Sequence, residues 1–319
     1  MNGAATSFPA IAVILPCYNE AGAIGKVVES FRAALPGATI HVFDNASTDG
    51  TAQVARGLGV RVHDVLLRGK GNVVRRMFAD VEADVYVITD GDATYDLSNI
   101  DAMVEGVLHK GCDMVVGARF DDGSNALAYR PGHRLGNQLL TGSVALLFGG
   151  KFTDMLSGHR VFSRRYVKSF PASARGFEIE TELTVHALEL RMATMELPVA
   201  YTSRPEGTVS KLSTYRDGWR ILKTIAKLFT SERPLAFFLL LATALALLSI
   251  GLALPLVVTY LQTGLVPRLP TAVLAMGVML SAMLSMLCGA VLHNVTLGRQ
   301  EAKRLVYLSI PAPGAAAAP

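Results

Sequence analysis

The residues Val85-Tyr-Val-Ile-Thr-Asp-Gly-Asp-Ala-Thr-Tyr-Asp96 give the clearest indication of how this chain folds. A β-branched, apolar run of the kind found in buried strands ends at Asp90-Gly91-Asp92. Side chains two positions apart in a strand lie on the same face, so the two carboxylates can point the same way. Mg²⁺ usually binds one or two carboxylates together with substrate phosphate oxygens, so the pair predicts a site for Mg²⁺ or Mn²⁺. The same residues also fit an Asp-Gly turn that closes a buried strand.

Strands and helices alternate on both sides of this stretch. Short apolar runs predict strands at residues 11–15, 39–43, 60–65, 84–89, 113–116 and 195–201. Helical periodicity predicts helices at 21–35, 51–58, 100–109 and 139–148, with two more ending near residues 81 and 191. Such alternation predicts an α/β fold with βαβ units on a mostly parallel sheet.

Polar, acidic and glycine residues follow several of the predicted strands. These segments are residues 17–20, Asp44, residues 68–72, residues 90–92 and residues 117–119. Ligands of open parallel sheets bind beyond the carboxyl ends of the strands, so the segments predict one site at that edge. Gly69-Lys70-Gly71 is too short for a Walker loop, and Gly57-Leu58-Gly59 lacks the third glycine of a dinucleotide fingerprint. Hydride transfer is therefore not expected.

The C-terminal part of the chain has the composition of a membrane anchor. Hydrophobic residues make up 51% of the 319 residues, and the mean hydropathy is +0.37. Residues 235–261 and 269–297 contain no Asp, Glu, Lys or Arg, and each exceeds the roughly 20 residues that span a bilayer. The short link between them predicts a transmembrane hairpin. Two buried core helices are the alternative.

Charges beside the two apolar segments predict their orientation. Cations flank the hairpin on both sides, whereas its tip carries only Arg268; the flanking cations are Lys223, Lys227, Arg233, Arg299, Lys303 and Arg304. The positive-inside rule then places the large N-terminal region and both termini in the cytoplasm, and we expect the inner (cytoplasmic) membrane of the cell. No signal-peptide pattern opens the chain, and three widely spaced cysteines fit a reducing compartment.

The net charge of +4 is concentrated just before the hairpin. Residues 204–233 hold seven Lys or Arg against three Asp or Glu, which equals the whole surplus. Residues 214–234 predict an amphipathic helix in the membrane interface, where anionic lipid would attract its cations; packing against the large N-terminal region is the alternative. No aromatic or basic recognition element accompanies these cations, so nucleic acid is not expected as a partner. The predicted domains are 1–213, 214–234, 235–297 and a tail, 298–319, with a disordered low-complexity end.

Four motifs in order resemble a known family. They are Pro16-Cys-Tyr-Asn-Glu20, Asp44-Asn-Ala-Ser-Thr-Asp-Gly-Thr51, Asp90-Gly-Asp92 and Arg204…Ser210-Lys211-Leu212. Together they resemble the family 2 glycosyltransferases, which have the Rossmann-like GT-A fold, and within them the polyprenyl-phosphate glycosyltransferases. The resemblance covers residues 11–212, and a C-terminal two-helix hairpin also occurs in that group.

The resemblance implies a role for each matching position. Pro16, Tyr18, Glu20 and Asp44 match residues that hold the base and ribose, Lys70 belongs with the donor-binding residues, and Asp90 and Asp92 match the pair that binds metal and diphosphate. Arg119 and Arg134 match phosphate-binding arginines, with Arg130 as the alternative to Arg134. Asp154 matches an acidic position near the acceptor. Arg204, Ser210 and Lys211 match a segment near the lipid phosphate.

The implied activity is transfer of a sugar from a nucleotide-sugar to a polyprenyl phosphate, with inversion at the anomeric carbon. A UDP-sugar and undecaprenyl phosphate are the expected pair, and a homo-oligomer is compatible with the sequence. A processive polysaccharide synthase is an alternative, although no Q-x-x-R-W motif occurs; a non-catalytic scaffold that binds nucleotide-sugar is another.

The sequence leaves several roles open. Asp154 either accepts a proton or orients the acceptor, and Asp96 either contacts metal through water or caps a helix. Glu178 and Glu182 share one face of a predicted helix and Glu180 lies on another, while acidic residues in a first turn also stabilise a helix by its macrodipole. Asn45 stands where the family frequently has an acidic residue.

Overall fold

The computed structural model describes residues 9–120, 133–202 and 214–312, which form two compact units. Residues 1–225 with 303–319 make up the first unit, and residues 226–302 make up the second. The strands are β1 (Ile11–Cys17), β2 (Thr39–Asp44), β3 (Arg61–Asp64), β4 (Val85–Ile88), β5 (Met114–Phe120), β6 (Arg160–Ser163) and β7 (Thr194–Ala200). The helices are α1 (Ala21–Ala34), α2 (Thr51–Gly57), α3 (Lys70–Asp80), α4 (Ile100–Leu108), α5 (His133–Phe148), α6 (Arg164–Ser169), α7 (Ile179–Glu189), α8 (Thr214–Glu232), α9 (Pro234–Thr263) and α10 (Leu269–Leu308).

The first unit is built on one seven-stranded sheet in the order β3-β2-β1-β4-β6-β5-β7. Strand β6 runs antiparallel to β4 and β5, and the remaining pairs are parallel. The predicted mostly parallel α/β sheet is therefore confirmed. The strand β6 and the short helix α6 were not predicted, because four buried residues and one helical turn carry too little periodicity to be recognised.

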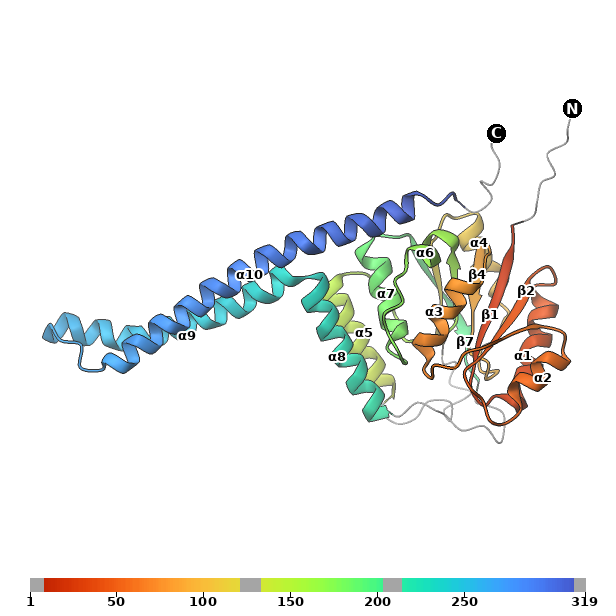
Figure 1. Cartoon of the computed structure of the whole chain (residues 1–319), viewed down its shortest axis with the longest axis horizontal. Helices are drawn as coiled ribbons and strands as arrows, with labels where there is room; N and C mark the ends of the chain where they lie inside the picture. Colours follow the sequence, from red (N-terminus) through yellow and green to blue (C-terminus); the bar gives the residue numbers. More distant parts are fainter. Residues whose placement is uncertain (1–8, 121–132, 203–213, 313–319) are drawn as a thin grey trace, which may run out of the picture. The chain divides into compact units, whose positions relative to one another are not determined.

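Helices cover both faces of this sheet (Figure 1). The helices α3, α6 and α7 pack against one face, around Phe78, Tyr86 and Phe162. The helices α1, α2 and α4 pack against the other, around Val13, Phe31 and Met103. Central strands buried on both sides explain why residues 85–88 read as an uninterrupted apolar run.

The antiparallel strand β6 brings an additional segment to the edge where the parallel strands end. Ile88, the last residue of β4, pairs with Arg160, the first residue of β6. The chain before Arg160 therefore arrives beside the chain after Ile88. The segment 154–159 and the Asp90-Gly91-Asp92 turn meet at the predicted site for this reason.

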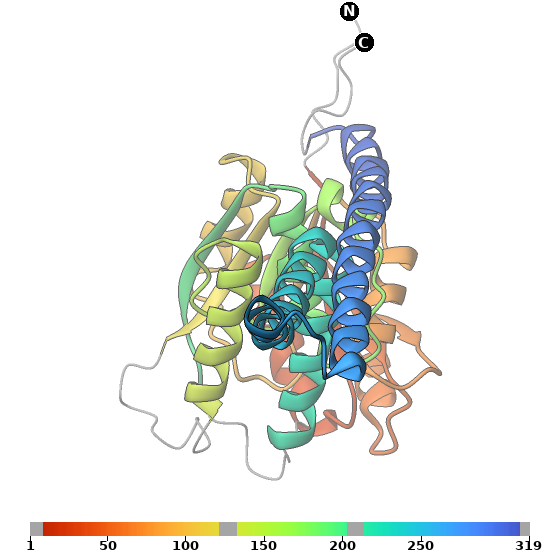
Figure 2. The ribbon, with the colours of Figure 1, turned by 90° about the vertical axis from the view of Figure 1, so that its left-hand side faces the viewer.

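The second unit contains two long apolar helices that run side by side (Figures 1 and 2). Both α9 and α10 are long and apolar enough to cross a membrane, and only 11% and 17% of their most apolar windows are buried. That low burial distinguishes them from core helices of a soluble domain. Small residues lie where the helices touch: Ser249 Oγ donates to the Ala275 carbonyl at 2.7 Å, and Gly289 faces Phe238. The predicted apolar helix pair is confirmed, and α10 continues past residue 297 to Leu308.

Candidate active site

The turn after β4 is held in one conformation by close packing and hydrogen bonds. A Cβ atom on Gly91 would lie 2.5 Å from the Cys17 Sγ atom, so only glycine allows this turn to approach the end of β1. The Asp92 side chain is buried, and its Oδ1 accepts hydrogen bonds from Thr94 Oγ1 at 2.6 Å and from Thr94 N at 3.3 Å. Thr94, which the sequence did not single out, thereby fixes one of the two predicted metal ligands.

Lys70 lies between two carboxylates beside this turn. Its Nζ atom is 2.5 Å from Asp90 Oδ1 and 2.6 Å from Glu180 Oε1. Burial alone would lower the pKa of Lys70, but the two carboxylates raise it above its ordinary value, so the ammonium stays charged. Glu180 comes from the buried first turn of α7. The sequence predicted only that it lies on a different helix face from Glu178 and Glu182, not which face meets the site.

Two glycines place Lys70 at this position. A Cβ on Gly69 would lie 2.1 Å from the Arg175 carbonyl oxygen, and one on Gly71 would lie 2.4 Å from the Ala174 carbonyl oxygen. The turn before α3 therefore packs directly on the loop before α7. Glu182 holds that loop by accepting from Ser173 N and Ala174 N at 3.1 and 2.7 Å.

Glu178 has a similar structural task in the same loop. Its Oε1 accepts hydrogen bonds from Arg175 N at 3.1 Å and from Gly176 N at 3.0 Å. Glu178 and Glu182 thus build the loop that supports the Lys70 turn, and Glu180 contacts Lys70 itself.

Polar residues also gather at the ends of β1 and β2, on the same edge of the sheet. Asp44 is buried; its Oδ2 accepts from Ser47 N at 3.1 Å, while its Oδ1 accepts no hydrogen bond within the described part of the chain. A buried acceptor of this kind is suited to a ligand hydroxyl or N–H group. Pro16 pairs with Phe43 beside it in the sheet, Tyr18 stacks under the Arg68 guanidinium at 5.4 Å, and the Glu20 side chain is buried.

Asn45 explains a departure from the family pattern. Its Nδ2 donates to the carbonyl oxygens of Val65 and Leu67 at 3.1 and 2.8 Å, and its Oδ1 accepts from Gly69 N at 2.7 Å. A carboxylate in this position could not donate. The amide therefore ties the end of β2 to the turn that carries Lys70.

Asp154 forms a buried ion pair with Arg119. Asp154 Oδ2 is 2.6 Å from Arg119 Nε, its Oδ1 is 2.8 Å from the second guanidinium nitrogen, and Asn137 Nδ2 also donates to Oδ1 at 2.9 Å. Burial alone would raise the pKa of Asp154, but the bonds from Arg119 and Asn137 lower it below its ordinary value. A carboxylate held in this way is a poor proton acceptor, so the geometry favours an orienting role over that of a base.

The loop that carries Asp154 is braced from within the protein. Arg160 is fully buried and donates to the carbonyl oxygens of Ser157 and Met155 and to Thr184 Oγ1. Its guanidinium therefore supports the loop and does not face the site edge. Arg160 is therefore a structural residue.

His159 lies beneath the same edge. Its Nδ1 atom bonds to Thr89 Oγ1, its ring stacks on Tyr95, and its Nε2 atom is buried with no hydrogen-bond partner among the described residues. Burial lowers the pKa of His159 to about 4, so the ring is neutral at pH 7. Gly158 N donates to the Tyr95 hydroxyl at 3.0 Å, which fixes the loop beside Asp90.

The remaining predicted site residues either lie away from the Asp90 turn or have side chains that the structure does not describe. Asp96 accepts from Ser98 N and Oγ at 3.2 and 2.7 Å in the turn before α4, whose N-cap is Asn99, so Asp96 shapes the turn and does not cap the helix. Arg204, Ser210, Lys211 and Arg130 lie outside the described residues. Arg134 is in the first turn of α5, where only the backbone is described.

The carboxylates fit a divalent metal only together with a ligand. No group of three or more His, Cys, Asp and Glu side chains that could hold a metal occurs in residues 9–120, 133–202 and 214–312. Asp90 and Asp92 supply two hard oxygen ligands on one turn, the number that Mg²⁺ takes when phosphate oxygens complete its coordination. The donor set therefore fits a metal shared with a diphosphate.

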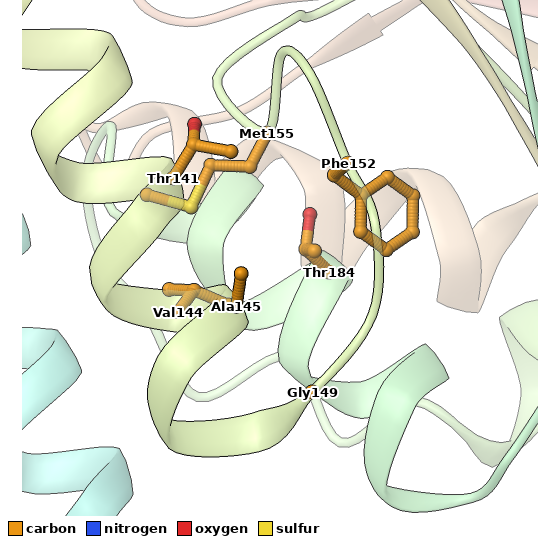
Figure 3. A pocket seen from close by; sticks show the side chains of 7 residues that line it. All are labelled: Thr141, Val144, Ala145, Gly149, Phe152, Met155 and Thr184. Carbon is orange, nitrogen blue, oxygen red and sulfur yellow. The ribbon is translucent and has the colours of Figure 1, made fainter.

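A small recess lined in part by Met155 lies near the loop that carries Asp154 (Figure 3). It lies between α5 and α7 and is lined by Thr141, Val144, Ala145, Gly149, Phe152, Met155 and Thr184. No water molecule fits into it. We regard it as a packing gap, and the ligand site as the strand edge.

Comparisons with known proteins agree with this geometry. The family described as glycosyl transferase family 2 matches residues 12–170. Glycosyltransferase AglJ of Haloferax volcanii is 31% identical over 307 residues, which are 94% of this chain and 98% of that protein. Dolichyl-phosphate hexose transferase of the same organism is 27% identical over 227 residues, or 71% of this chain and 97% of that protein.

Solved structures share the fold of the first unit. Glucosyl-3-phosphoglycerate synthase from Mycobacterium tuberculosis, in complex with phosphoglyceric acid, superposes with a TM-score of 0.54 at 25% identity, over 69% of this chain and 79% of that one. The covered sheet with its acidic turn defines a glycosyltransferase of the GT-A fold. Within that class, the chain belongs to glycosyl transferase family 2.

Proposed function

We propose that this enzyme transfers a hexose from a nucleotide-sugar, a UDP-sugar in the first instance, to a polyprenyl phosphate at the cytoplasmic face of a membrane. The observation that carries the proposal is the Asp90-Gly91-Asp92 turn, with Lys70 beside it, in a chain with two apolar helices long enough to span a bilayer. The relative named dolichyl-phosphate hexose transferase supports the choice of acceptor.

The donor would bind along the strand edge. The buried Asp44 oxygen would accept from the ribose or the base, and Tyr18 and Glu20 would lie along the same part of the strand edge. Asp90 and Asp92 would hold the divalent metal that, when bound, neutralises charge on the donor diphosphate. Lys70 adds a fixed ammonium at the same place, where positive charge stabilises a leaving diphosphate.

In the reaction, a lipid phosphate oxygen would attack the anomeric carbon and form a new C–O bond. The bond from that carbon to the diphosphate breaks, and its electron pair leaves with the nucleotide diphosphate. A phosphate monoester has a second pKa of about 6, so the nucleophile is already ionised at neutral pH and needs no strong base. This agrees with an Asp154 carboxylate that is occupied by Arg119.

The acceptor would approach from the bilayer. Trp219 and Leu222 of α8 expose apolar surface, as do Leu139 and Leu146 of α5. Side chains of this kind fit the boundary between lipid head groups and acyl chains. Arg204, Ser210 and Lys211 remain the proposed donors to the lipid phosphate, with Arg119 as a further cation near the acceptor.

Transfer of labelled sugar into lipid tests the proposal. The purified chain in detergent is incubated with radiolabelled UDP-sugars, undecaprenyl phosphate and Mn²⁺, and label is counted in the organic extract. We expect lipid-linked label that falls at least about 100-fold with Asp92→Asn and disappears on metal chelation. Asp64→Asn, an exposed change at the end of β3, serves as the control. A polymer product would favour the processive synthase, and absence of transfer with every donor would refute the proposal.

A further inference from the structure

Lys70 is the point at which two parts of the first unit meet. Its ammonium touches Asp90, which follows β4, and Glu180, which opens α7. Two carboxylates share one cation, and Glu180 is almost completely buried. A buried carboxylate is costly unless a cation compensates it, so the Lys70 ammonium stabilises the charge of Glu180 as well as that of Asp90.

The surroundings leave Lys70 little freedom. A Cβ on Gly158 would lie 2.6 Å from Asp90 Oδ2 and 2.9 Å from Lys70 Nζ, so the loop backbone closes over the pair. The close contacts of Gly69 and Gly71 with the loop before α7 fix the backbone from which Lys70 extends. The ammonium can therefore shift between its two acceptors but has no room for a larger movement.

The Asp90 carboxylate would therefore have to bind both the Lys70 ammonium and the divalent metal. The Lys70 ammonium lies 2.5 Å from its Oδ1 atom, and a divalent metal needs oxygen from the same carboxylate. Two positive charges this close repel each other, so metal binding must weaken the contact between Lys70 and Asp90. Glu180 offers the ammonium a second acceptor that takes no part in the predicted metal site.

We propose that Glu180 is a positioning residue that retains Lys70 when a divalent metal binds Asp90, so that metal and ammonium act on the donor diphosphate together. Before metal binds, Lys70 is the counter-ion of Asp90. Once metal binds, Glu180 keeps the ammonium beside the site. This inference rests on the proposed function, because it requires the metal at Asp90 and Asp92.

The test is a double-mutant cycle read out by Mn²⁺ affinity, without turnover. Mn²⁺ is titrated into the full-length chain in detergent, with and without UDP, and binding is followed by electron paramagnetic resonance. The variants are Glu180→Gln, Lys70→Met and the combination of both. We expect Glu180→Gln to weaken Mn²⁺ binding roughly tenfold when Lys70 is present, because the ammonium then depends on Asp90 alone. In the Lys70→Met background the same change should weaken binding no more than about twofold, through lost negative charge only.

If Glu180→Gln weakens Mn²⁺ binding by the same factor with Lys70 and with Lys70→Met, the inference is overturned. The effect of Glu180 on the metal is then a charge effect that does not depend on Lys70. Glu82→Gln, at an exposed ion pair, controls for removal of any carboxylate. Thermal unfolding checks that each variant is folded; if Lys70→Met does not fold, Lys70→Gln replaces it in the cycle.

Asp92→Asn separates this inference from the function on which it rests. If the wild-type chain binds Mn²⁺ and Asp92→Asn weakens that binding while the cycle shows no coupling, the inference alone is wrong. If the wild-type chain binds no Mn²⁺ with or without UDP, the inference and the proposed metal site both fail.

Discussion

Arg119 binds Asp154 with two side-chain nitrogens, at 2.6 and 2.8 Å, and also donates its backbone N–H to the same carboxylate at 3.2 Å. The Arg119 guanidinium also lies over the ring of Tyr201, 5.6 Å from its centroid. One face of the cation is thereby fixed by an aromatic ring and one edge by a carboxylate. Such a pair acts as a unit, which has a measurable consequence.

We expect Asp154→Asn and Arg119→Gln to be strongly non-additive. Arg119→Gln removes the cation that compensates the buried Asp154 carboxylate, which costs about 3–5 kcal/mol of stability, and Asp154→Asn should cost less because Arg119 is only partly buried. The free energy of unfolding of the double variant should fall by less than the sum of the two single losses, because both charges of the pair are then removed together. Denaturant unfolding of the four proteins in detergent measures this. Additive losses would show that the two side chains do not act as a pair.

Asp44→Asn should weaken donor binding with little effect on the chemical step. The Asp44 Oδ1 atom is buried without a donor, so a ligand hydroxyl or N–H would gain a hydrogen bond there. A hydrogen bond to a charged group contributes about 1.5–3 kcal/mol, which predicts an increase in the donor KM of at least about tenfold. Asp64→Asn, on the exposed end of β3, is the matched control. A changed kcat with an unchanged KM would contradict the assignment.

Gly71→Ala should disturb Lys70 through the backbone. The new Cβ would lie 2.4 Å from the Ala174 carbonyl oxygen, so the turn and the loop before α7 must separate. We expect a loss of about 1–3 kcal/mol of stability together with weakened Mn²⁺ binding. Gly25→Ala is the control: nothing lies within 4 Å of its Cβ in the interior of α1, and alanine favours helix by about 1 kcal/mol. Equal stabilities of the two variants would refute the close contact.

His186 should make the first unit sensitive to acid. Burial, helped by the positive charge of Lys303, lowers the pKa of this histidine to about 3, against 6.5 for the free side chain. Between pH 6.5 and 3 the unfolded chain binds a proton that the native protein does not, so stability falls as pH decreases through that window. His186→Leu should reduce the slope of unfolding free energy by about 1.4 kcal/mol per pH unit. An identical slope in both proteins, measured from pH 6.5 to pH 4.5, would show that His186 is not held neutral.

Local sequence determined the elements and the acidic turn. The period of apolar residues gave the order of strands and helices, because each signal lies within a dozen residues. The absence of charge over residues 235–261 and 269–297 likewise identified two helices that a membrane could accept. The short strand β6 was not predicted, because four residues are too few to show a period of apolar side chains.

Only the tertiary structure decided which charges meet. Glu178, Glu180 and Glu182 look alike in sequence, yet two of them hold a loop and one holds Lys70, since the direction of each side chain depends on how α7 packs against α3. The antiparallel course of β6 likewise brought Asp154 and Gly158 to the edge where the parallel strands end. The sequence thus determined that Asp90 and Asp92 stand at the end of a strand. Packing of distant segments determined that Asp90 already has a cationic partner, because contacts between residues far apart in the chain leave no periodic trace in it.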